Sequence, residues 1–362
     1  MVKPKTKKIC IIVSSLGAGG AERSSAILSE MLFDLGYDIH IVSVLNKIDY
    51  PYKGTLLNLG ALKDKDDTVL GKLKRLRVFK NYLKAHNFDY VIDSRTRIGF
   101  FREFIISKFI YNPRKTIYCV RSYNTDSYIN PSRVFGNTLY GSAHRIIAVS
   151  NGISVKLKKK YGFKNLTIIN NPIVINNISV MSEVDVKNKF ILFFGRLDDS
   201  IKNISLLLQA YAESEIFQKE IKLIILGKGK DKNALLNKSE ILGLKNSVSF
   251  LEYKSNPYGW VKEALFTVLT SKYEGFPRTL IESLALGTPV ISVDCKSGPN
   301  EIIINENNGL LVENHNIKAL AQAMDRLVED KELYLRCKAN AKSSVAHLSM
   351  KTIGLQWKTI LN

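Results

Sequence analysis

The chain has 362 residues, 45% of them hydrophobic and 24% charged, with a formal net charge of +20. This composition is typical of a folded soluble protein and excludes disordered and fibrous chains, and no stretch approaches the ~20 apolar residues of a membrane-spanning helix. The four cysteines stand far apart without a Cys-x-x-Cys pair, which argues against a disulfide framework or a zinc site and favours a reducing cytosol.

The positive charge is concentrated in the first half of the chain. Residues 1–177 contain 29 Lys and Arg against 12 Asp and Glu, a net charge of +17, whereas the remaining 185 residues contain 24 against 21, a net charge of +3. A basic half implies a polyanionic partner, which is a nucleic acid, an anionic membrane face or a phosphorylated substrate.

Apolar runs rich in β-formers alternate with helix-period stretches along the whole chain, which is typical of βαβ units around a parallel sheet. Strands are predicted over 9–14, 38–44, 90–93, 190–194, 222–226 and 247–251. Helices are predicted over 21–35, 72–86, 204–216, 232–242, 316–328, 330–343 and 351–361.

We therefore expect an α/β protein with two doubly wound domains. Residues 1–177 form the N-terminal Rossmann-like domain, 178–189 a linker and 190–345 the C-terminal Rossmann-like domain. Residues 346–362 are predicted to form a C-terminal helix, and one possible arrangement packs this helix against the N-terminal domain.

The first motif with chemistry is a glycine-rich turn over residues 17–23, between a predicted strand and a predicted helix. Gly19 and Gly20 let the backbone approach a ligand, and free N–H groups at a helix start attract anions. A dinucleotide fingerprint would need a third glycine where Glu22 stands, so a dehydrogenase is disfavoured. A turn without a ligand is the alternative.

The second motif, Gly195-Arg196-Leu197 followed by Lys202, comes just after the predicted strand 190–194. Ligands of open α/β sheets bind beyond the carboxyl ends of the strands, where a guanidinium and an ammonium suit a diphosphate. Without further support, the same residues describe two cations on a solvated loop.

The third motif spans residues 273–292 and supplies that support. Pro277 is predicted at the first helical position and Gly287 just past the helix end, with a strand over 289–293 after it. Glu274 then lies in the loop before the helix and Glu282 inside it, so that two carboxylates flank an anion-binding helix N-terminus. A capped helix with two solvent-facing acids fits this segment alone about as well.

Taken together, these motifs resemble the retaining glycosyltransferases of family 4, which have the GT-B fold of two Rossmann-like domains facing across a cleft. The similarity covers nearly the whole chain in the right order. It is carried by the Glu274 and Glu282 pair with seven residues between, Gly-Gly-Ala-Glu-Arg at 19–23, Gly195-Arg196-Leu197, Lys202-Asn203, Asn171-Pro172 and Gly298-Pro299-Asn300-Glu301.

The resemblance implies roles for residues at matching positions. Arg196 and Lys202 would neutralise the donor diphosphate, Glu282 would bind the ribose hydroxyls, and Gly19 and Gly20 would approach the diphosphate from the other domain. Glu301 would lie near the donor, with an ordinary helix N-terminal acid as the alternative. The transferred sugar and the helix N-terminus would be held by Glu274, Gly275, Phe276, Pro277, Arg278, Thr279 and Leu280.

One departure concerns a histidine that many family members place after a strand of the N-terminal domain, facing the sugar. The matching segment here, 118–124, offers Arg121. An arginine stays charged and cannot shuttle a proton, but it can stabilise negative charge on the leaving diphosphate.

We expect no metal and no cofactor beyond the nucleotide-sugar donor. Asp64 with Asp66, and Asp198 with Asp199, superficially resemble acidic pairs that hold a divalent ion. Solvated loops are the simpler interpretation of both pairs.

Two basic, partly apolar stretches suggest contact with an anionic membrane. Residues 72–84 surround Leu73, Leu76, Phe79 and Leu83 with six cations, and residues 99–110 interleave phenylalanines with Arg102 and Lys108. An ordinary amphipathic helix explains the first stretch alone equally well. A nucleic-acid module is not recognisable.

We therefore predict a metal-independent hexosyltransferase on the inner, cytoplasmic face of a bacterial cell membrane. It would move a hexose or N-acetylhexosamine, with UDP favoured as carrier, onto a lipid-linked glycan for a surface polysaccharide such as lipopolysaccharide or capsule. Two alternatives stay open: a UDP-sugar epimerase of the same fold, and a basic nucleic-acid-binding protein.

Overall fold

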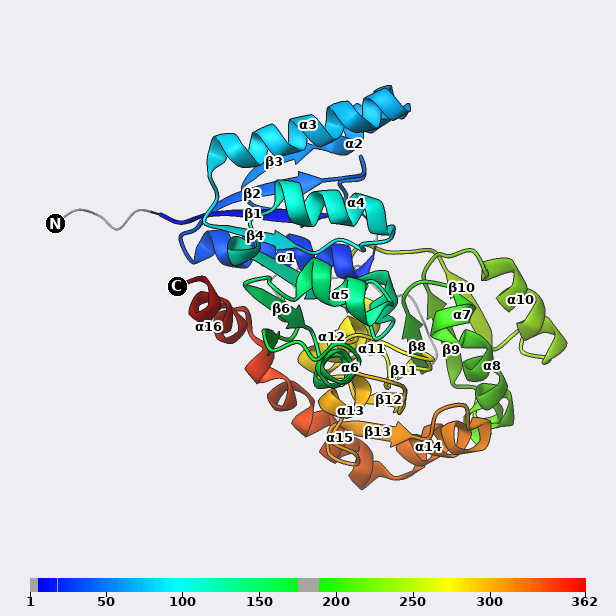
Figure 1. Ribbon diagram of the computed structural model, residues 1–362. Helices are drawn as coiled ribbons and strands as arrows, with labels where there is room; N and C mark the ends of the chain where they lie inside the picture. Colours follow the sequence, from blue (N-terminus) through cyan, green and yellow to red (C-terminus); the bar gives the residue numbers. More distant parts are fainter. Residues whose placement is uncertain (1–5, 18, 175–188) are drawn as a thin grey trace. The chain divides into compact units, whose positions relative to one another are not determined.

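The computed structural model describes residues 6–17, 19–174 and 189–362 (Figure 1). It divides into two compact units, the first formed by Met1–Pro172 with Met350–Asn362 and the second by Ile173–Ser349. The predicted linker 178–189 lies outside the described residues, apart from Lys189.

The first unit is built on a parallel sheet with the strand order β3-β2-β1-β4-β5-β6-β7. The strands are β1 (Lys8–Val13), β2 (Asp38–Ser43), β3 (Thr55–Asn58), β4 (Tyr90–Asp93), β5 (Thr116–Val120), β6 (Arg145–Ala148) and β7 (Leu166–Ile168). The helices are α1 (Gly20–Asp34), α2 (Leu59–Lys65), α3 (Val69–His86), α4 (Phe100–Ile105), the π-helix η1 (Ile106–Ile110), η2 (Pro113–Lys115), η3 (Thr125–Ser127), α5 (Arg133–Tyr140), α6 (Asn151–Tyr161) and α16 (Met350–Leu361).

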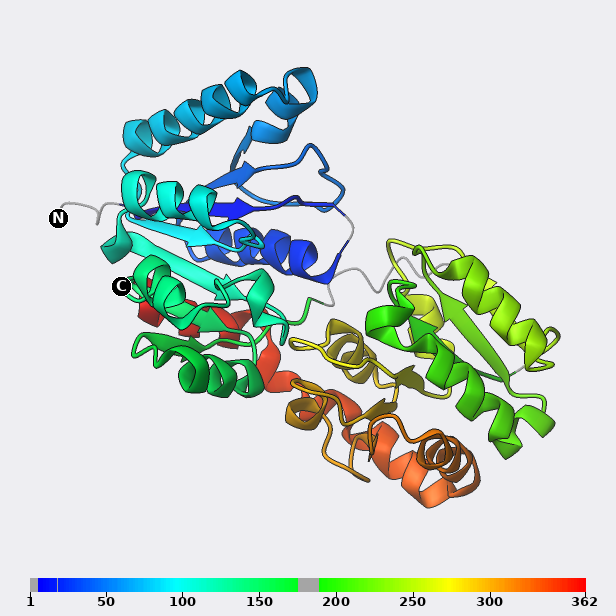
Figure 2. The same ribbon diagram turned by 45° about the vertical axis from the view of Figure 1, so that its right-hand side comes forward.

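Helices cover both faces of this sheet. Right-handed crossovers place α1 on one face and α3, α4, α5 and α6 on the other, as Figures 1 and 2 show. The C-terminal helix α16 packs beside α1, where Gly354 comes close to Leu35 and Met31. Both faces are thus shielded from water, and β1 and β2 are buried along their whole length after the first residue of each strand.

The apolar side of α3 differs from the membrane-facing stripe expected from its sequence. Phe79 is buried and packs on the ring of Tyr111, while Leu76 and Leu83 are half-buried. Of the four predicted stripe residues only Leu73 is exposed. The stripe largely packs α3 against its own domain. The exposed large apolar side chains of α3 are Val69, Leu70 and Leu73, at its start.

The second unit is built on a parallel sheet with the order β10-β9-β8-β11-β12-β13. The strands are β8 (Phe190–Phe194), β9 (Lys222–Leu226), β10 (Val248–Leu251), β11 (Thr267–Leu269), β12 (Val290–Val293) and β13 (Gly309–Val312). The helices are α7 (Asp199–Lys202), α8 (Ile204–Glu213), α9 (Glu215–Gln218), α10 (Lys232–Ile241), α11 (Tyr258–Glu263), α12 (Arg278–Leu286), α13 (Pro299–Ile302), α14 (Ile317–Glu329), α15 (Lys331–Ser344) and the short η4 (Ala346–Leu348).

Alternation along β8 divides the core of this unit between the two faces of the sheet. Ile191 and Phe193 join one apolar cluster, and Phe190, Leu192 and Phe194 join the other. Successive side chains of a strand point to opposite faces, so an unbroken apolar strand indicates helices on both sides. The expected α/β class and two doubly wound domains are confirmed.

Two predicted helix details are wrong. The helix expected over 204–216 is interrupted at Ser214, whose backbone is extended and whose Oγ donates to the carbonyl of Tyr211 at 2.7 Å. The carboxylate of Asp325 accepts from the N–H of Ile216 at 3.1 Å and so supports the start of α9. Pro277 is the residue before α12 rather than its first helical residue, while Gly287 ends α12 with a φ of 87° as expected.

Among the described helices, none combines the length and the hydropathy needed to cross a bilayer.

Candidate functional site

The second-unit motifs meet where the strand order reverses. Strands β9 and β10 lie on one side of β8, and β11, β12 and β13 lie on the other. The loops after β8 and β11 therefore diverge at the carboxyl edge of the sheet and leave room for a ligand between them. Arg196 follows β8, and Glu274 lies in the loop after β11.

The Arg196 loop is held by close backbone contact with the loop after β9. A Cβ at Gly227 would lie 1.9 Å from the carbonyl oxygen of Gly195, and one at Gly229 would lie 2.1 Å from that of Leu197. The N–H of Leu197 donates to the carbonyl of Lys228 at 3.0 Å. The backbone is thereby fixed while the Arg196 side chain is exposed to solvent.

Lys202 and Glu274, 72 residues apart, form an ion pair at this edge. Lys202 Nζ donates to Glu274 Oε1 at 2.5 Å, and the Ser271 hydroxyl donates to the same oxygen at 2.6 Å. The two side chains are 20% and 13% exposed, so both are largely sheltered yet reachable from solvent. The structure brings together the predicted diphosphate cation and the predicted sugar carboxylate.

Glu282 is buried inside α12 and paired with Arg278, one turn earlier. Arg278 Nε and Nη2 lie 3.1 and 2.9 Å from Glu282 Oε1, with side chains only 7% and 4% exposed. Neither Glu274 nor Glu282 is a freely solvated acid, so the alternative of two solvent-facing carboxylates is wrong.

The loop before α12 rests on the turn that precedes α13. Ser297 Oγ donates to the carbonyl of Gly275 at 2.9 Å, and a Cβ on Gly298, whose φ is 100°, would meet the Pro277 ring at 2.5 Å. Gly275, Phe276, Pro277, Arg278 and Leu280 are buried, whereas Thr279 and Glu301 are half-buried. The predicted sugar-binding loop is therefore a packed element.

Cys295 lies in the same region but has the character of a core residue. Burial raises the pKa of its thiol, and the nearby Glu274 carboxylate raises it further. The group stays a neutral thiol, unsuited to act as a nucleophile.

In the first unit, Gly19 and Gly20 stand at the start of α1, after β1. The N–H of Gly19 donates to the Tyr50 hydroxyl at 3.3 Å, and Gly20 is exposed, with no described atom within 4 Å of where its Cβ would be. Packing within the described part of the chain does not demand a glycine at position 20. A glycine at this position would allow a ligand to approach the backbone closely.

Arg121 follows β5 at the same carboxyl edge of the first sheet. Its Nη1 donates to Asn171 Oδ1 at 3.0 Å and its Nη2 to Ser94 Oγ at 3.4 Å, while its buried Nε has no hydrogen-bond partner among the described residues. With Asn171, Ser24 and Trp357 it lines a cavity of about 10 Å³, the room of one water molecule. Arg121 and the Asn171-Pro172 motif are thus neighbours.

The acidic pairs weighed as metal ligands bind protein groups instead. Asp199 starts α7 and accepts from the N–H of Ser205 at 2.8 Å, and the Ser200 hydroxyl, with Lys230, lowers the pKa of Asp198 despite partial burial. The expectation that this pair is a solvated loop is wrong, because Asp199 lies in α7 and supports the start of α8, and Asp198 is half-buried with Ser200 and Lys230 as partners. Within residues 6–17, 19–174 and 189–362, no three His, Cys, Asp or Glu side chains are grouped to hold a metal ion.

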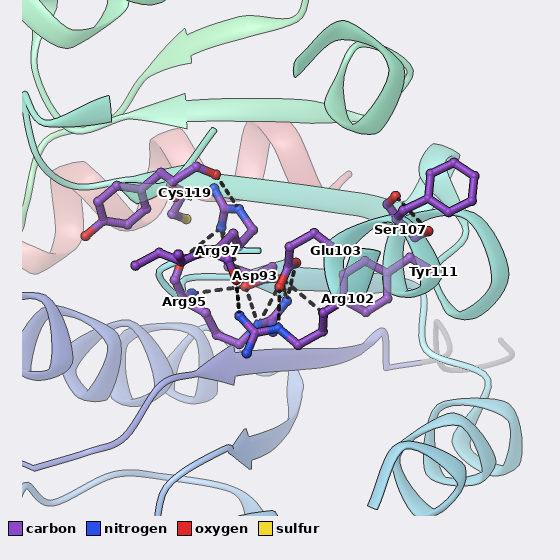
Figure 3. A network of polar contacts seen from close by, with 11 residues as sticks. Asp93, Arg95, Arg97, Arg102, Glu103, Ser107, Tyr111 and Cys119 are labelled. Atoms are coloured by element: carbon purple, nitrogen blue, oxygen red, sulfur yellow. Dashed lines mark hydrogen bonds and ion pairs between the residues drawn. The ribbon is translucent and has the colours of Figure 1, made fainter. Parts of the chain in front are cut away.

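Sequence reasoning missed a buried ionic network at the end of β4 (Figure 3). Arg95 bonds to both oxygens of Asp93, at 3.0 and 2.6 Å, and to Glu103 Oε2 at 3.1 Å, while Arg97 lies 3.6 Å from Asp93. Asp93, Arg95, Arg97 and Glu103 are all at most 5% exposed. The available sequence signal for this network was the alternation of charged residues after a strand. For the packed Arg196 loop, the signal was the pair of glycines Gly227 and Gly229.

Comparison with known proteins supplies an independent view. Residues 174–344 match the family described as glycosyl transferases group 1. The chain is 30% identical, over 93% of its length and 94% of the relative's, to the N-acetylgalactosamine-N,N'-diacetylbacillosaminyl-diphospho-undecaprenol 4-alpha-N-acetylgalactosaminyltransferase of Campylobacter jejuni. It is 24% identical to the amylovoran biosynthesis glycosyltransferase AmsD of Erwinia amylovora, over 98% of this chain and 99% of that one.

Solved structures share the architecture at lower identity. Staphylococcus aureus TarM, in complex with fondaparinux, alpha-GlcNAc-glycerol and UDP, superposes with a TM-score of 0.78 at 16% identity, over 99% of this chain and 100% of that one. Anabaena HepE in complex with UDP-glucose gives 0.77 at 18% identity, over 98% and 99%. These similarities confirm the expected fold.

Proposed function

The chain belongs to the glycosyl transferases group 1 family, whose members are retaining hexosyltransferases, and from this membership we propose its donor, acceptor and site residues. The donor is a UDP-linked hexose or N-acetylhexosamine. The acceptor is a lipid-linked glycan in the biosynthesis of a bacterial surface polysaccharide. The Campylobacter relative, whose name specifies a diphospho-undecaprenol acceptor, and the UDP-glucose complex of HepE support these choices.

The observation that carries the proposal is the pairing of Lys202 with Glu274 at the switch point of the second sheet, where the exposed Arg196 follows β8. A sugar leaving its nucleotide places negative charge on the diphosphate, and cations already in position stabilise that charge. Arg196 and Lys202 supply these cations. Glu274 accepts hydrogen bonds from the sugar hydroxyls, and in the unliganded chain it keeps the Lys202 ammonium in place.

The donor extends from this pair across the start of α12. The N–H groups around Arg278, Thr279 and Leu280 face the negative groups of the ligand, since the first turn of a helix leaves its N–H groups unpaired. Glu282, oriented by Arg278, binds the ribose hydroxyls, and Glu301 lies near the donor. In the first unit, Gly19, Gly20 and Arg121 lie at the carboxyl edge of the sheet, where Arg121 is a permanent cation.

The enzyme works on the cytoplasmic face of the membrane that holds its acceptor. Along α3 the side chains of Lys72, Lys74, Arg77, Lys80 and Lys84 are exposed, whereas Arg75 is bound by Asp67. Exposed cations of this kind attract a protein to anionic lipid. A diphosphate donor alone needs only a few of the cations in this half of the chain.

Screening purified protein against a panel of nucleotide sugars, with and without a polyprenyl-diphosphate-linked acceptor, tests the proposal. We expect release of UDP from one or a few donors and transfer of the sugar to the acceptor with its anomeric configuration retained. An epimerised sugar still attached to UDP would identify the epimerase alternative. Salt-sensitive binding to duplex DNA without turnover of any donor would identify the nucleic-acid alternative.

A further inference from the structure

Apolar side chains are exposed on and beside the helices α3, α4 with η1, and α5 of the first unit. Around α4 and η1, Phe101 is 81%, Ile98 68% and Phe109 64% exposed, and at the start of α5 Val134 is 70% exposed and Phe135 45%. At the start of α3, Val69, Leu70 and Leu73 are exposed as well. We call the set from α4, η1 and α5 the aromatic surface.

The aromatic surface is continuous. The rings of Phe135 and Phe100 lie 4.5 Å apart, Phe100 and Phe104 5.7 Å, and Phe104 and Phe109 6.1 Å. Phe100 and Phe104 are half-buried and link the exposed rings of Phe101, Phe109 and Phe135. A continuous apolar patch that reaches water is unfavourable for a monomer, and such patches mark interaction sites. Scattered single apolar residues would carry no such meaning.

The charges around the aromatic surface have one sign. Arg102, Lys108 and Arg133 are exposed beside it, and the acid within residues 98–110, Glu103, is buried in the ionic network. Residues 131–140 contain no acid at all. Exposed phenylalanines bordered by cations fit the boundary between acyl chains and anionic headgroups.

The ionic network makes this surface a rigid one. Arg95 ties Glu103 of α4 to Asp93 at the end of β4, and the Tyr111 hydroxyl, just past η1, donates to Asp93 at 3.0 Å. Both ends of the α4 and η1 segment are thereby anchored to the sheet (Figure 3). The rings are held in position rather than free to fold back into the domain.

Topology places the start of the aromatic surface at the carboxyl edge of the first sheet. Each of α3, α4 and α5 begins at the carboxyl edge of the sheet, the edge that also carries Gly20 and Arg121, and all three lie on the face opposite α1 (Figure 2). A bilayer that touches these helix starts lies close to that edge of the first unit.

We propose that the aromatic surface inserts into the lipid bilayer, between headgroups and acyl chains, and holds the enzyme there after the cations of α3 have attracted it. The inference rests on the proposed function, which supplies a reason for the enzyme to stay at a membrane. Attraction by α3 is electrostatic and weakens with salt, whereas insertion of phenylalanine side chains persists in salt.

Phe101→Trp tests insertion directly, because Trp260 and Trp357, the native tryptophans, are buried. With vesicles of phosphatidylcholine and phosphatidylglycerol we expect a blue-shifted emission and quenching by brominated acyl chains. The matched control is Ile241→Trp, at an 85% exposed position of α10 in the second unit, which should show neither effect. Equal responses from both variants, or none from Phe101→Trp, would overturn the inference.

A second experiment uses Phe101→Ser with Phe109→Ser in vesicle flotation at high salt, with Ile241→Ser as control. Each of the two phenylalanine substitutions should lower the partition constant by about tenfold, while UDP release from the donor is unchanged. The control should bind vesicles as the wild type does. If the double variant turns over the donor and binds vesicles as well as the wild type, the aromatic surface is disproved and the proposed function stands. If the double variant loses vesicle binding but no donor is turned over, the aromatic surface stands and the proposed function is disproved. If the wild-type protein self-associates in lipid-free solution and the serine substitutions abolish this, the aromatic surface binds a second copy of the chain and the bilayer proposal is wrong.

Discussion

Each carboxylate of the family motif is matched with its own cation. Lys202 with Glu274 and Arg278 with Glu282 are both largely sheltered pairs. Sheltered pairs add little net stability, because the cost of removing charge from water offsets the attraction between the partners. Their value lies in orientation, since each carboxylate is held at a defined position by its cation.

Replacing Lys202 with Met should reduce transfer without unfolding the protein. Loss of a cation that stabilises the leaving diphosphate should lower kcat by about 10²–10³-fold. Steady-state release of UDP measures the effect, and Lys331→Met, an exposed lysine at the start of α15, is the matched control. If the two variants have equal kcat, Lys202 does not stabilise the leaving diphosphate.

Replacing Glu282 with Ala should weaken donor binding. A charge-assisted hydrogen bond to the ribose contributes ~1.5–3 kcal/mol, so calorimetry should show a correspondingly larger Kd. Glu282→Gln, which keeps an oxygen that accepts from Arg278, should fall between wild type and Glu282→Ala. Unchanged donor affinity in the Ala variant would disprove the ribose assignment.

At the scale of elements, the ionic network joins β4 to α4. Burial alone would raise the pKa of Asp93, but the guanidinium groups of Arg95 and Arg97 outweigh it, and the pKa lies below its usual range. Asp93 therefore stays ionised in the folded chain. Its carboxylate is the point at which the loop after β4, helix α4 and Tyr111 converge.

Asp93→Asn should destabilise the first unit by about 3–5 kcal/mol, because it leaves buried guanidinium groups without their counter-charge. Denaturant unfolding measures this, with Asp38→Asn, an exposed partner of Lys8, as a control expected to change stability by at most ~1 kcal/mol. The lowered pKa also sets the pH dependence. The contribution of Asp93 is complete above about pH 5 and is lost as the pH falls through the folded-state pKa, so the variant should show a flatter acid limb than wild type.

At the scale of the whole molecule, charge is divided between the halves of the chain. The site in the second unit places Arg196 and Lys202 at the switch point, while the large excess of cations belongs to residues 1–177. In our proposal the first set of cations binds the donor diphosphate and the second set attracts the protein to an anionic membrane surface. This division leads to one prediction about metal and one about membranes.

Turnover should survive EDTA. In our proposal the diphosphate is neutralised by Arg196 and Lys202, so a divalent ion has no charge left to balance. UDP release before and after chelation measures this. Complete loss of activity in EDTA, restored by Mg²⁺ or Mn²⁺, would contradict it.

Reversing the exposed cations of α3 should release the enzyme from anionic vesicles at low salt. Lys74, Arg77 and Lys80 changed to Glu remove about 1 kcal/mol of attraction each and add repulsion. Sedimentation should show the variant in the supernatant while donor hydrolysis is retained. Lys318, Lys331 and Lys338 changed to Glu, exposed positions of the second unit, form the control. If the wild-type protein does not sediment with anionic vesicles at low salt, the membrane proposal is wrong.

Local pattern was sufficient for the elements and for the order of the motifs. Strand β8 matches its prediction at both ends, and α1, α3 and α12 lie within three residues of theirs, because the spacing of apolar residues and the residues at helix ends act over one or two turns. The positions of Arg196 and Glu274 after strands likewise predicted the carboxyl edge, since every parallel strand ends there.

Contacts between distant segments were decided by the tertiary structure. Three features depend on which strands are neighbours and which helices cover each face. They are the bond between Lys202 and Glu274, the break at Ser214 supported by Asp325, and the burial of Phe79 of α3. The same holds for the aromatic surface, where α5 adds Phe135 to rings from α4. Apolar periodicity shows that a side of a helix is hydrophobic, but only its packed neighbours determine whether that side is buried in the domain or left open to a partner.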